Sequence, residues 1–242
     1  MKAKSSFSLA IVLFLFISTL SAQQKLKVSI LGDSYSTFYG CVTPATNLCW
    51  YGVPGDIKEN DVTKVEETWW HHLISEHGLL LERNNSYSGS TISNTGYNKI
   101  DYSDRSFIAR MDNLGNPDII LVFGGTNDSW AGVPIGNYQY SDWTKADLYN
   151  FRPAFCRLLD YLTSQYPRTK IYNITNSELS DDVTNSMAEI CRHYKITNIL
   201  LHDIDKQWGH PSVKGMKDIS EQLWEAFAGV EGAVAKPYLL VR

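Results

Sequence analysis

Short apolar runs alternate with longer stretches of helical periodicity along most of the chain. Five of these runs predict β-strands, at residues 25–31, 79–82, 118–123, 170–174 and 198–201. The third run, "DIILVF", is apolar at nearly every position, which is typical of a strand that is buried on both faces. Such strands need a covering layer on each side of the sheet.

The segments between the strands predict those covering layers. Helical patterns occupy residues 67–77, 105–114, 145–165, 180–194 and 211–227. We expect Pro153 to kink or divide the third helix, Ser180 to cap the fourth and Pro211 to open the last. Strands that alternate with helices of this length predict a parallel sheet with helices on both faces. In such sheets, ligands bind beyond the carboxyl ends of the strands.

The N-terminal residues predict an export signal that precedes this fold. Lys2 and Lys4 come before an apolar stretch from Leu9 to Ile17, and small residues follow as far as Ala22. This arrangement is typical of a secretory signal peptide, residues 1–22. An uncleaved anchor is the alternative, although the apolar stretch is short for a membrane span. We therefore expect a secreted or periplasmic domain over residues 23–242, without stable membrane insertion.

The charge of the chain bears on its partners. The 242 residues include 22 Lys and Arg against 26 Asp and Glu, for a net charge of -4. Loss of Lys2 and Lys4 with the signal peptide makes the chain more acidic. An acidic chain without a cluster of Lys and Arg argues against nucleic acid as a partner. The sequence does not predict the oligomeric state.

Four cysteines follow the predicted cleavage site. Cys41 and Cys49 lie in one irregular segment and could form a disulfide in an oxidising compartment. Cys156 and Cys191 fall on predicted helices, where buried small apolar residues are expected. Their spacing matches no zinc motif, so we expect no metal site and no cofactor.

Three polar segments follow the ends of predicted strands. Ser34 comes directly after the first strand, "GGTND" follows the third, and His210 follows the fifth. The carboxyl ends of parallel strands share one edge of a sheet, so these segments are expected to meet. A serine, a base that takes its proton and donors for an oxyanion can together attack an ester carbonyl. His210 is the candidate base, because of the six histidines it alone lies in a strand-to-helix loop beside a proline.

These segments, in this order, resemble the sequence blocks of the SGNH, or GDSL, hydrolase family. The first block is "GDS", ending at Ser34, and the second is "NNSYSGSTI", with Gly89 as its glycine and Gly96 as an alternative. The third is "GTND", which contains Asn127, and the last is "HP" at His210. The resemblance extends over about residues 28–215. Each block is short, and their common order at strand ends makes the combination specific.

The resemblance implies both a fold and an activity. The fold would be a flavodoxin-like three-layer α/β/α sandwich with a mainly parallel five-stranded sheet, and the activity that of a serine ester hydrolase. Ser34 would be the nucleophile and His210 the general base. The backbone N–H groups of Ser34 and Gly89, with the side-chain amide of Asn127, would form the oxyanion hole. No metal or cofactor is implied.

One position departs from the family pattern. The family usually has an aspartate three residues before the histidine, and this chain has Gln207 there. A glutamine can accept the ring N–H, but it cannot neutralise an imidazolium. Asp203, Asp205, a backbone carbonyl or Gln207 itself could orient the ring of His210. We favour a Ser–His dyad in which a carbonyl or Gln207 is the orienting group.

Aromatic loops around the predicted site indicate the substrate class. The segments 35–65 and 128–143 are rich in Tyr and Trp, which suit stacking on sugar rings. We therefore expect a secreted esterase that removes acetyl or other short acyl groups from carbohydrate, with a small-molecule or glycan ester as its partner. The alternatives are a lipase-like or lysophospholipase-like acylhydrolase, and a catalytically weakened scaffold that binds glycans.

Overall fold

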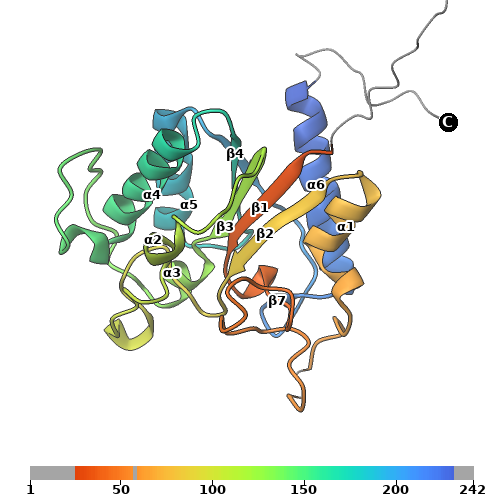
Figure 1. The fold of residues 1–242 in the computed structure, drawn as a ribbon. Helices are drawn as coiled ribbons and strands as arrows, with labels where there is room; N and C mark the ends of the chain where they lie inside the picture. Colours follow the sequence, from red (N-terminus) through yellow and green to blue (C-terminus); the bar gives the residue numbers. More distant parts are fainter. Residues whose placement is uncertain (1–24, 57–58, 232–242) are drawn as a thin grey trace, which may run out of the picture.

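Five parallel strands form the centre of the molecule in a computed structural model that describes residues 25–56 and 59–231 (Figure 1). The predicted signal peptide, residues 1–22, lies outside the described residues and stays a prediction. The strands are β1 (Lys27–Gly32), β2 (Leu80–Ser86), β3 (Ile119–Gly124), β4 (Lys170–Thr175) and β5 (Thr197–Leu200). Their order, β2-β1-β3-β4-β5, is that of a flavodoxin-like sheet. The predicted fold class is confirmed.

Helices cover both faces of this sheet, and alternate residues of each strand face opposite layers. Leu121 and Phe123 of β3 pack with α1 (Trp69–Glu76) and α6 (Val213–Glu231), whereas Ile120 and Val122 face the other way. That second layer contains α2 (Phe107–Arg110), α4 (Phe151–Gln165) and α5 (Asp181–Tyr194). Figure 1 shows α1 and α6 on one side of the sheet and α4 and α5 on the other. Burial on both faces explains why β3 is apolar throughout.

The strand register brings the functional loops to one edge. Gly32 at the end of β1 pairs with Ser86 of β2 and with Phe123 of β3. The N–H of Asp33 then donates to the Phe123 carbonyl at 3.3 Å. The loops after β1, β2 and β3 therefore leave the sheet side by side, at the lower edge in Figure 1.

The structure tests two predictions about proline. The segment predicted as one helix, residues 145–165, is divided at extended Asn150 into η4 (Asp147–Tyr149) and α4 (Phe151–Gln165). Pro153 lies in the first turn of α4, where a missing N–H costs no intrahelical hydrogen bond, so the predicted division is found and no kink is needed. Pro211 does not open α6, because it belongs to a hairpin of β6 (Lys206–Gln207) and β7 (His210–Pro211). The helix begins at Val213, after Ser212, whose Oγ accepts from the Gly215 N–H at 3.1 Å.

Strand β2 extends four residues beyond its predicted end. Those residues include Asn84 and Asn85, whose polarity concealed the strand although both are buried. Their side chains are satisfied inside the protein: Asn84 donates to the Ser36 carbonyl at 2.8 Å, and Asn85 donates to the Arg110 carbonyl at 3.0 Å. Buried polar groups need such partners, and only the tertiary structure supplies them.

The four cysteines are free thiols in this structure. The disulfide considered for Cys41 and Cys49 is therefore not formed. Cys156 and Cys191 are buried in the core between the sheet and α4 and α5, as predicted.

Neither a metal cluster nor a membrane span is found in residues 25–56 and 59–231. Within these ranges no three His, Cys, Asp or Glu side chains are grouped so that they could hold a metal ion. None of the helices in the same ranges has the length and apolar character needed to cross a membrane.

Candidate active site

Ser34 begins a short 3-10 helix, η1 (Ser34–Ser36), directly after β1. Asp33 caps this helix, since its carboxylate accepts from the Tyr35 N–H at 3.0 Å. The turn requires Gly32, because a Cβ there would lie 2.5 Å from Ser86 Oγ and 2.7 Å from Ser36 Oγ. This close packing holds Ser34 at the edge of the sheet.

His210 reaches Ser34 from 176 residues away in the chain. Its Nε2 lies 3.0 Å from Ser34 Oγ, and both residues are nearly buried. The hairpin β6–β7 presents the imidazole, with Trp208 and Gly209 forming its two-residue turn. Both turn residues have positive φ, 53° and 73°, as a type I′ turn requires. The structure thus brings together the serine and the histidine that the sequence singled out.

The second nitrogen of the His210 ring contacts a backbone carbonyl. Nδ1 lies 3.3 Å from the carbonyl oxygen of Trp208. A carbonyl oxygen can only accept, so this contact requires the proton on Nδ1 and leaves Nε2 as the acceptor for the Ser34 hydroxyl. That tautomer is the one a general base needs.

The side chains considered as orienting groups for His210 are directed elsewhere. Gln207 accepts the N–H of Asp61 at 2.9 Å with its side-chain oxygen. The Asp205 carboxylate accepts from the Ser212 hydroxyl at the start of α6, and the Asp203 side chain is 97% exposed. Of the alternatives left open by the sequence, the backbone carbonyl is the one in contact with the ring.

Two tyrosines of the aromatic segment 35–65 hold the hairpin in place, a role that the sequence did not reveal. The Tyr35 hydroxyl donates to the Gly209 carbonyl, and the Tyr51 hydroxyl donates to the Pro211 carbonyl at 3.0 Å. Burial raises the pKa of both phenols above the ordinary value, so both remain protonated donors. Because Tyr35 lies next to Ser34, it couples the position of the hairpin to that of the serine.

Asn127 lies in the short helix α3 (Thr126–Trp130), after β3. Its side-chain Nδ2 donates to the Ser90 carbonyl at 3.0 Å, and its Oδ1 accepts from the Tyr97 hydroxyl at 2.8 Å. These two contacts determine the orientation of the amide, since a carbonyl cannot donate. An NH2 group has two N–H bonds, so one remains for a substrate.

The Cα of Gly89 faces open space, whereas that of Gly96 does not. Gly89 has a φ of 79°, and nothing lies within 4 Å of where its Cβ would be. A Cβ on Gly96 would instead meet the Tyr102 ring at 2.4 Å. The loop of Gly89 starts beside the nucleophile turn, because the Tyr87 N–H donates to the Gly32 carbonyl at 3.1 Å. This placement fits the predicted backbone donor.

Buried Arg110 connects the segments that carry these groups. Its guanidinium donates to the Gly32 carbonyl at 3.1 Å, to Ser90 Oγ at 2.9 Å and to the Asn85 carbonyl. It therefore joins the ends of β1 and β2 to the loop that holds Asn127. Nothing in the sequence pointed to this residue beyond its place in a predicted helix.

Two buried carboxylates accompany Arg110. Burial raises the pKa of Asp33 to about 7 and that of Asp128 to about 6, while it lowers the pKa of Arg110 to about 9. Asp128 accepts from the N–H groups of Ile92 and Ser93, at 2.7 and 3.2 Å. Beneath the candidate site there is thus a network of buried ionisable side chains and backbone groups.

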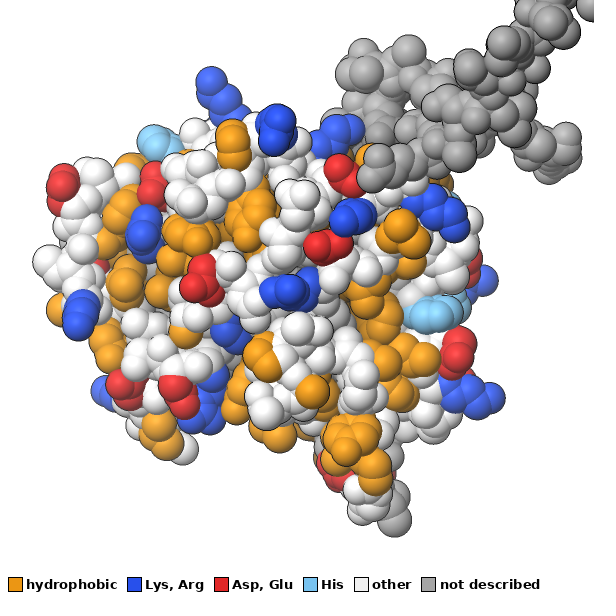
Figure 2. Space-filling model, viewed as in Figure 1, with side chains coloured by type: hydrophobic (Ala, Val, Ile, Leu, Met, Phe, Trp, Pro, Cys, Tyr) orange, Lys and Arg blue, Asp and Glu red, His pale blue; other side chains and the backbone are white. Residues whose placement is uncertain are grey.

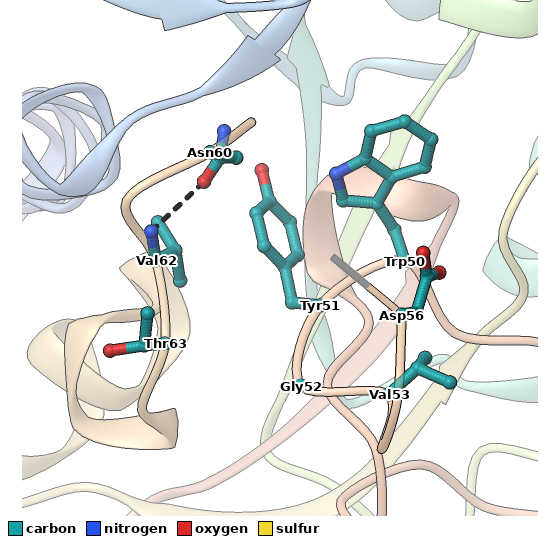
Figure 3. Close-up of a pocket in the computed structure, with 8 residues that line it drawn as sticks. All are labelled: Trp50, Tyr51, Gly52, Val53, Asp56, Asn60, Val62 and Thr63. Carbon is teal, nitrogen blue, oxygen red and sulfur yellow. Dashed lines mark hydrogen bonds between the residues drawn. The ribbon is translucent and has the colours of Figure 1, made fainter. Parts of the chain in front are cut away.

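A pocket of about 380 Å³ lies in the segment whose Trp50 and Tyr51 rings contact the His210 ring, although neither Ser34 nor His210 lines it. Its lining residues are Trp50, Tyr51, Gly52, Val53, Asp56, Asn60, Val62 and Thr63 (Figure 3). The Asn60 amide donates to the Pro211 carbonyl at 3.1 Å, so the pocket wall is attached to the hairpin that carries His210. The lining is mixed, with aromatic rings, a carboxylate, an amide and a hydroxyl.

The chain is similar to proteins of known structure over most of its length. The family model described as GDSL-like lipase/acylhydrolase matches residues 26–227. A protein from Bacteroides uniformis, assigned as a GDSL-like lipase, is 74% identical, with a TM-score of 0.85 over 86% of this chain and 97% of that one. A counterpart from Bacteroides ovatus with the same assignment is 55% identical, with a TM-score of 0.84 over 86% and 100%.

A more distant structure shares the fold. A family two carbohydrate esterase from Clostridium thermocellum, solved in complex with cellohexaose, is 16% identical, with a TM-score of 0.54 over 88% of this chain and 67% of that one. Among curated proteins, no sequence matches this chain.

Proposed function

The chain belongs to the GDSL-like lipase/acylhydrolase family, and on this basis we propose that it is a secreted serine esterase that removes acetyl or other short acyl groups from carbohydrate. Membership of the family implies ester hydrolysis. The observation that carries the mechanism is the 3.0 Å contact of Ser34 Oγ with His210 Nε2, on a ring whose Nδ1 faces a carbonyl.

In the first half of the proposed reaction, Ser34 Oγ attacks the ester carbonyl carbon while His210 Nε2 takes the hydroxyl proton. The carbonyl oxygen gains the electron pair and becomes an oxyanion. The N–H groups of Ser34, Gly89 and the Asn127 amide would then donate to it. When the bond to the alcohol breaks, His210 returns its proton to the leaving oxygen, and the acyl group stays on Ser34.

Water completes the cycle from the same side. His210 Nε2 takes a proton from water, which attacks the acyl carbon and forms a second oxyanion in the same hole. Collapse of that intermediate expels Ser34 Oγ, which recovers its proton from His210 and releases the carboxylic acid. The Trp208 carbonyl accepts the Nδ1–H throughout, so the reaction runs with a Ser–His dyad.

Exposed aromatic rings support a carbohydrate as the alcohol part of the ester. Trp208 is 72% exposed and Trp130 is 46% exposed, and the Trp130 ring lies 6.0 Å from the His210 ring. Large aromatic residues are uncommon at the left-handed position that Trp208 occupies, where Asn, Asp or Gly is preferred. An exposed indole at that position suits a contact with a ligand, and sugar rings stack on such faces.

The surface charge fits an uncharged substrate. On the face shown in Figure 2, Lys and Arg side chains are interspersed with Asp and Glu side chains. The mixed lining of the pocket that Trp50 and Tyr51 share with polar side chains also suits a polar substrate better than a long acyl chain.

Export is the part of the proposal that concerns the N-terminal residues. It is supported by the basic, apolar and small-residue segments of residues 1–22. N-terminal sequencing of the protein from the periplasm or medium would test it, and a mature chain that starts at Gln23 is the expected result. A protein retained in the cytoplasm with its N-terminus intact would contradict it.

Two other functions are supported by specific observations. The assignment of the Bacteroides relatives as GDSL-like lipases favours a lipase-like acylhydrolase. Gln207 pairs with His210 across the hairpin, but its side-chain oxygen accepts from Asp61, and this favours a glycan-binding scaffold with weakened catalysis.

Hydrolysis of p-nitrophenyl esters from acetate to dodecanoate would separate these functions. Residues 23–242 would be compared with Ser34→Ala, and an acetylated oligosaccharide would be tested in parallel. Turnover of acetate and of the oligosaccharide, lost in Ser34→Ala, is the expected result. A preference for long chains would indicate a lipase. Glycan binding without turnover, unchanged in Ser34→Ala, would indicate a scaffold.

A further inference from the structure

Trp50 covers one face of the His210 ring. The two ring centroids lie 3.6 Å apart, and the ring planes differ by 3°. The other aromatic neighbours are more distant and inclined: Tyr35 at 5.3 Å and 53°, Trp130 at 6.0 Å and 66°, and Tyr51 at 6.3 Å and 78°. Trp50 is therefore the ring in full stacking contact with the candidate base.

The backbone holds this indole in its place. The backbone N–H of Trp50 donates to Thr37 Oγ1 at 2.9 Å, and the Thr37 hydroxyl donates to the Ser34 carbonyl at 2.9 Å. The indole also packs against the buried core beneath the site. Trp50 is thus linked to the segment that carries the nucleophile, and it also touches the base.

A stacked indole acts differently on the two charge states of a histidine. The π face of Trp is electronegative, so it attracts a cation placed over it within about 6 Å, and Trp is the strongest of the aromatic residues in this respect. The neutral imidazole gains no comparable attraction. General-base catalysis places the positive charge on His210 in each transition state, so an indole at 3.6 Å stabilises those states preferentially.

Stabilisation of the imidazolium by Trp50 matters because the side chains considered as orienting groups are bonded elsewhere. Gln207 and Asp205 are bonded to other groups, and the Nδ1 contact is to a neutral carbonyl. A carboxylate attracts an imidazolium with a full negative charge, whereas a carbonyl offers only a dipole, so the carbonyl stabilises the imidazolium less.

We propose that Trp50 is a positioning residue that stabilises the imidazolium form of His210 through its stacked face and keeps the ring directed at Ser34. The proposal rests on the proposed function in one respect, that His210 acts as the base. It assigns to an aromatic face part of the electrostatic role that a carboxylate has in a Ser–His–Asp triad.

Other titratable groups lie on the elements packed around His210. A test must leave their identity unchanged, since each of them could affect the titration of His210. They include Asp33, Tyr35, Tyr51, Asp56, Asp61, Asp128, Glu178, Asp205, Lys206 and Lys214. Substitutions at residue 50 leave all of them in place. A change in the titration of His210 would then follow from the side chain at residue 50.

The test compares Trp50→Leu and Trp50→Phe with the unaltered protein. Leucine keeps apolar cover over His210 and removes the π face, whereas alanine would also admit water and raise the pKa by hydration. The pH dependence of kcat/KM for p-nitrophenyl acetate reports the base of the free enzyme. An imidazole NMR titration of His210 reports the same group without requiring turnover.

We expect the acid limb of the profile, and the NMR midpoint of His210, to move to lower pH by about 0.4–1.5 in Trp50→Leu. The plateau of kcat/KM should fall by about 2- to 30-fold. Trp50→Phe retains a weaker π face and should give intermediate values. If Trp50→Leu does not fold, the same direction of shift is required of Trp50→Phe.

The chain contains a matched control. Trp224 stacks on His77 with centroids 3.6 Å apart and planes 5° apart, at a site remote from Ser34. Trp224→Leu should move the NMR titration of His77 and leave the rate profile unchanged. This variant therefore measures how the loss of an equivalent stacked indole affects the stability of the protein when the candidate active site is untouched.

Two results would overturn the proposal. One is a His210 midpoint that stays in place, or rises, in both Trp50 variants, even if activity falls; Trp50 would then serve packing only. The other is an equal change of the rate profile in Trp224→Leu. If the unaltered protein hydrolyses nothing while the NMR midpoint shifts as expected, the proposed function fails and the stabilisation by Trp50 stands.

Discussion

Tyr97 is expected to control the oxyanion hole through Asn127. Its hydroxyl donates to Asn127 Oδ1 at 2.8 Å, and the Ser90 carbonyl holds the other end of the amide at 3.0 Å. Burial raises the pKa of Tyr97 to about 12, so the hydroxyl is a donor over the whole working range. Tyr97→Phe removes this one hydrogen bond and leaves the bond to Ser90 in place.

The size of the effect depends on whether a substitution removes the donor or only the group that orients it. Asn127→Ala removes the donor itself, which typically costs about 10²–10³ in kcat. Tyr97→Phe removes one hydrogen bond that orients the donor, with a net value of about 0.5–1.5 kcal/mol, so kcat should fall by about 2- to 12-fold. Because the oxyanion forms only in the transition state, KM should change little.

Steady-state kinetics on p-nitrophenyl acetate would measure this in a double-mutant cycle. Tyr97→Phe should lower kcat when Asn127 is present, and it should have no effect on kcat in the Asn127→Ala background. Tyr194→Phe is the control, because within the described residues its hydroxyl is buried without a hydrogen-bond partner. The reasoning would be refuted by an unchanged kcat in Tyr97→Phe, or by the same loss with and without Asn127.

The remaining predictions concern stability and substrate. The pKa of Asp33 is raised by burial to about 7, so between about pH 4 and 7 the folded state binds its proton more tightly than the unfolded chain, and this group lowers stability as the pH rises. In urea unfolding, the stability of Asp33→Asn relative to the unaltered protein should therefore increase as the pH rises from about 4 to 7; a constant difference would contradict this. Gly32→Ala should cost about 1–3 kcal/mol in the same assay, because its Cβ would lie 2.5 Å from Ser86 Oγ, and an unchanged midpoint would show that the turn can relax. Trp208→Asn keeps a residue suited to the left-handed turn, and it should lower kcat/KM for an acetylated oligosaccharide up to about tenfold more than for p-nitrophenyl acetate; equal losses would exclude a sugar contact.

The sequence by itself determined the layers of the fold and the edge where the site lies. Apolar periodicity reports burial, so a strand buried on both faces, such as β3, and an amphipathic helix, such as α5, are visible without coordinates. The carboxyl ends of parallel strands meet at one edge, which is enough to place Ser34 and Asn127 near each other. The polar end of β2 was missed because its asparagines are buried with partners that lie elsewhere in the chain.

Only the tertiary structure decided how the histidine is held. The carbonyl at Nδ1 belongs to Trp208, in a turn whose geometry positions it, and a carbonyl is present at every residue and so leaves no sequence signal. The indole of Trp50 and the hydroxyl of Tyr35 reach the hairpin across more than half of the chain. Contacts of this kind depend on how distant segments pack, whereas periodicity describes only the environment of each segment. For that reason the sequence identified the residues of the candidate site, and the structure supplied the groups that orient them.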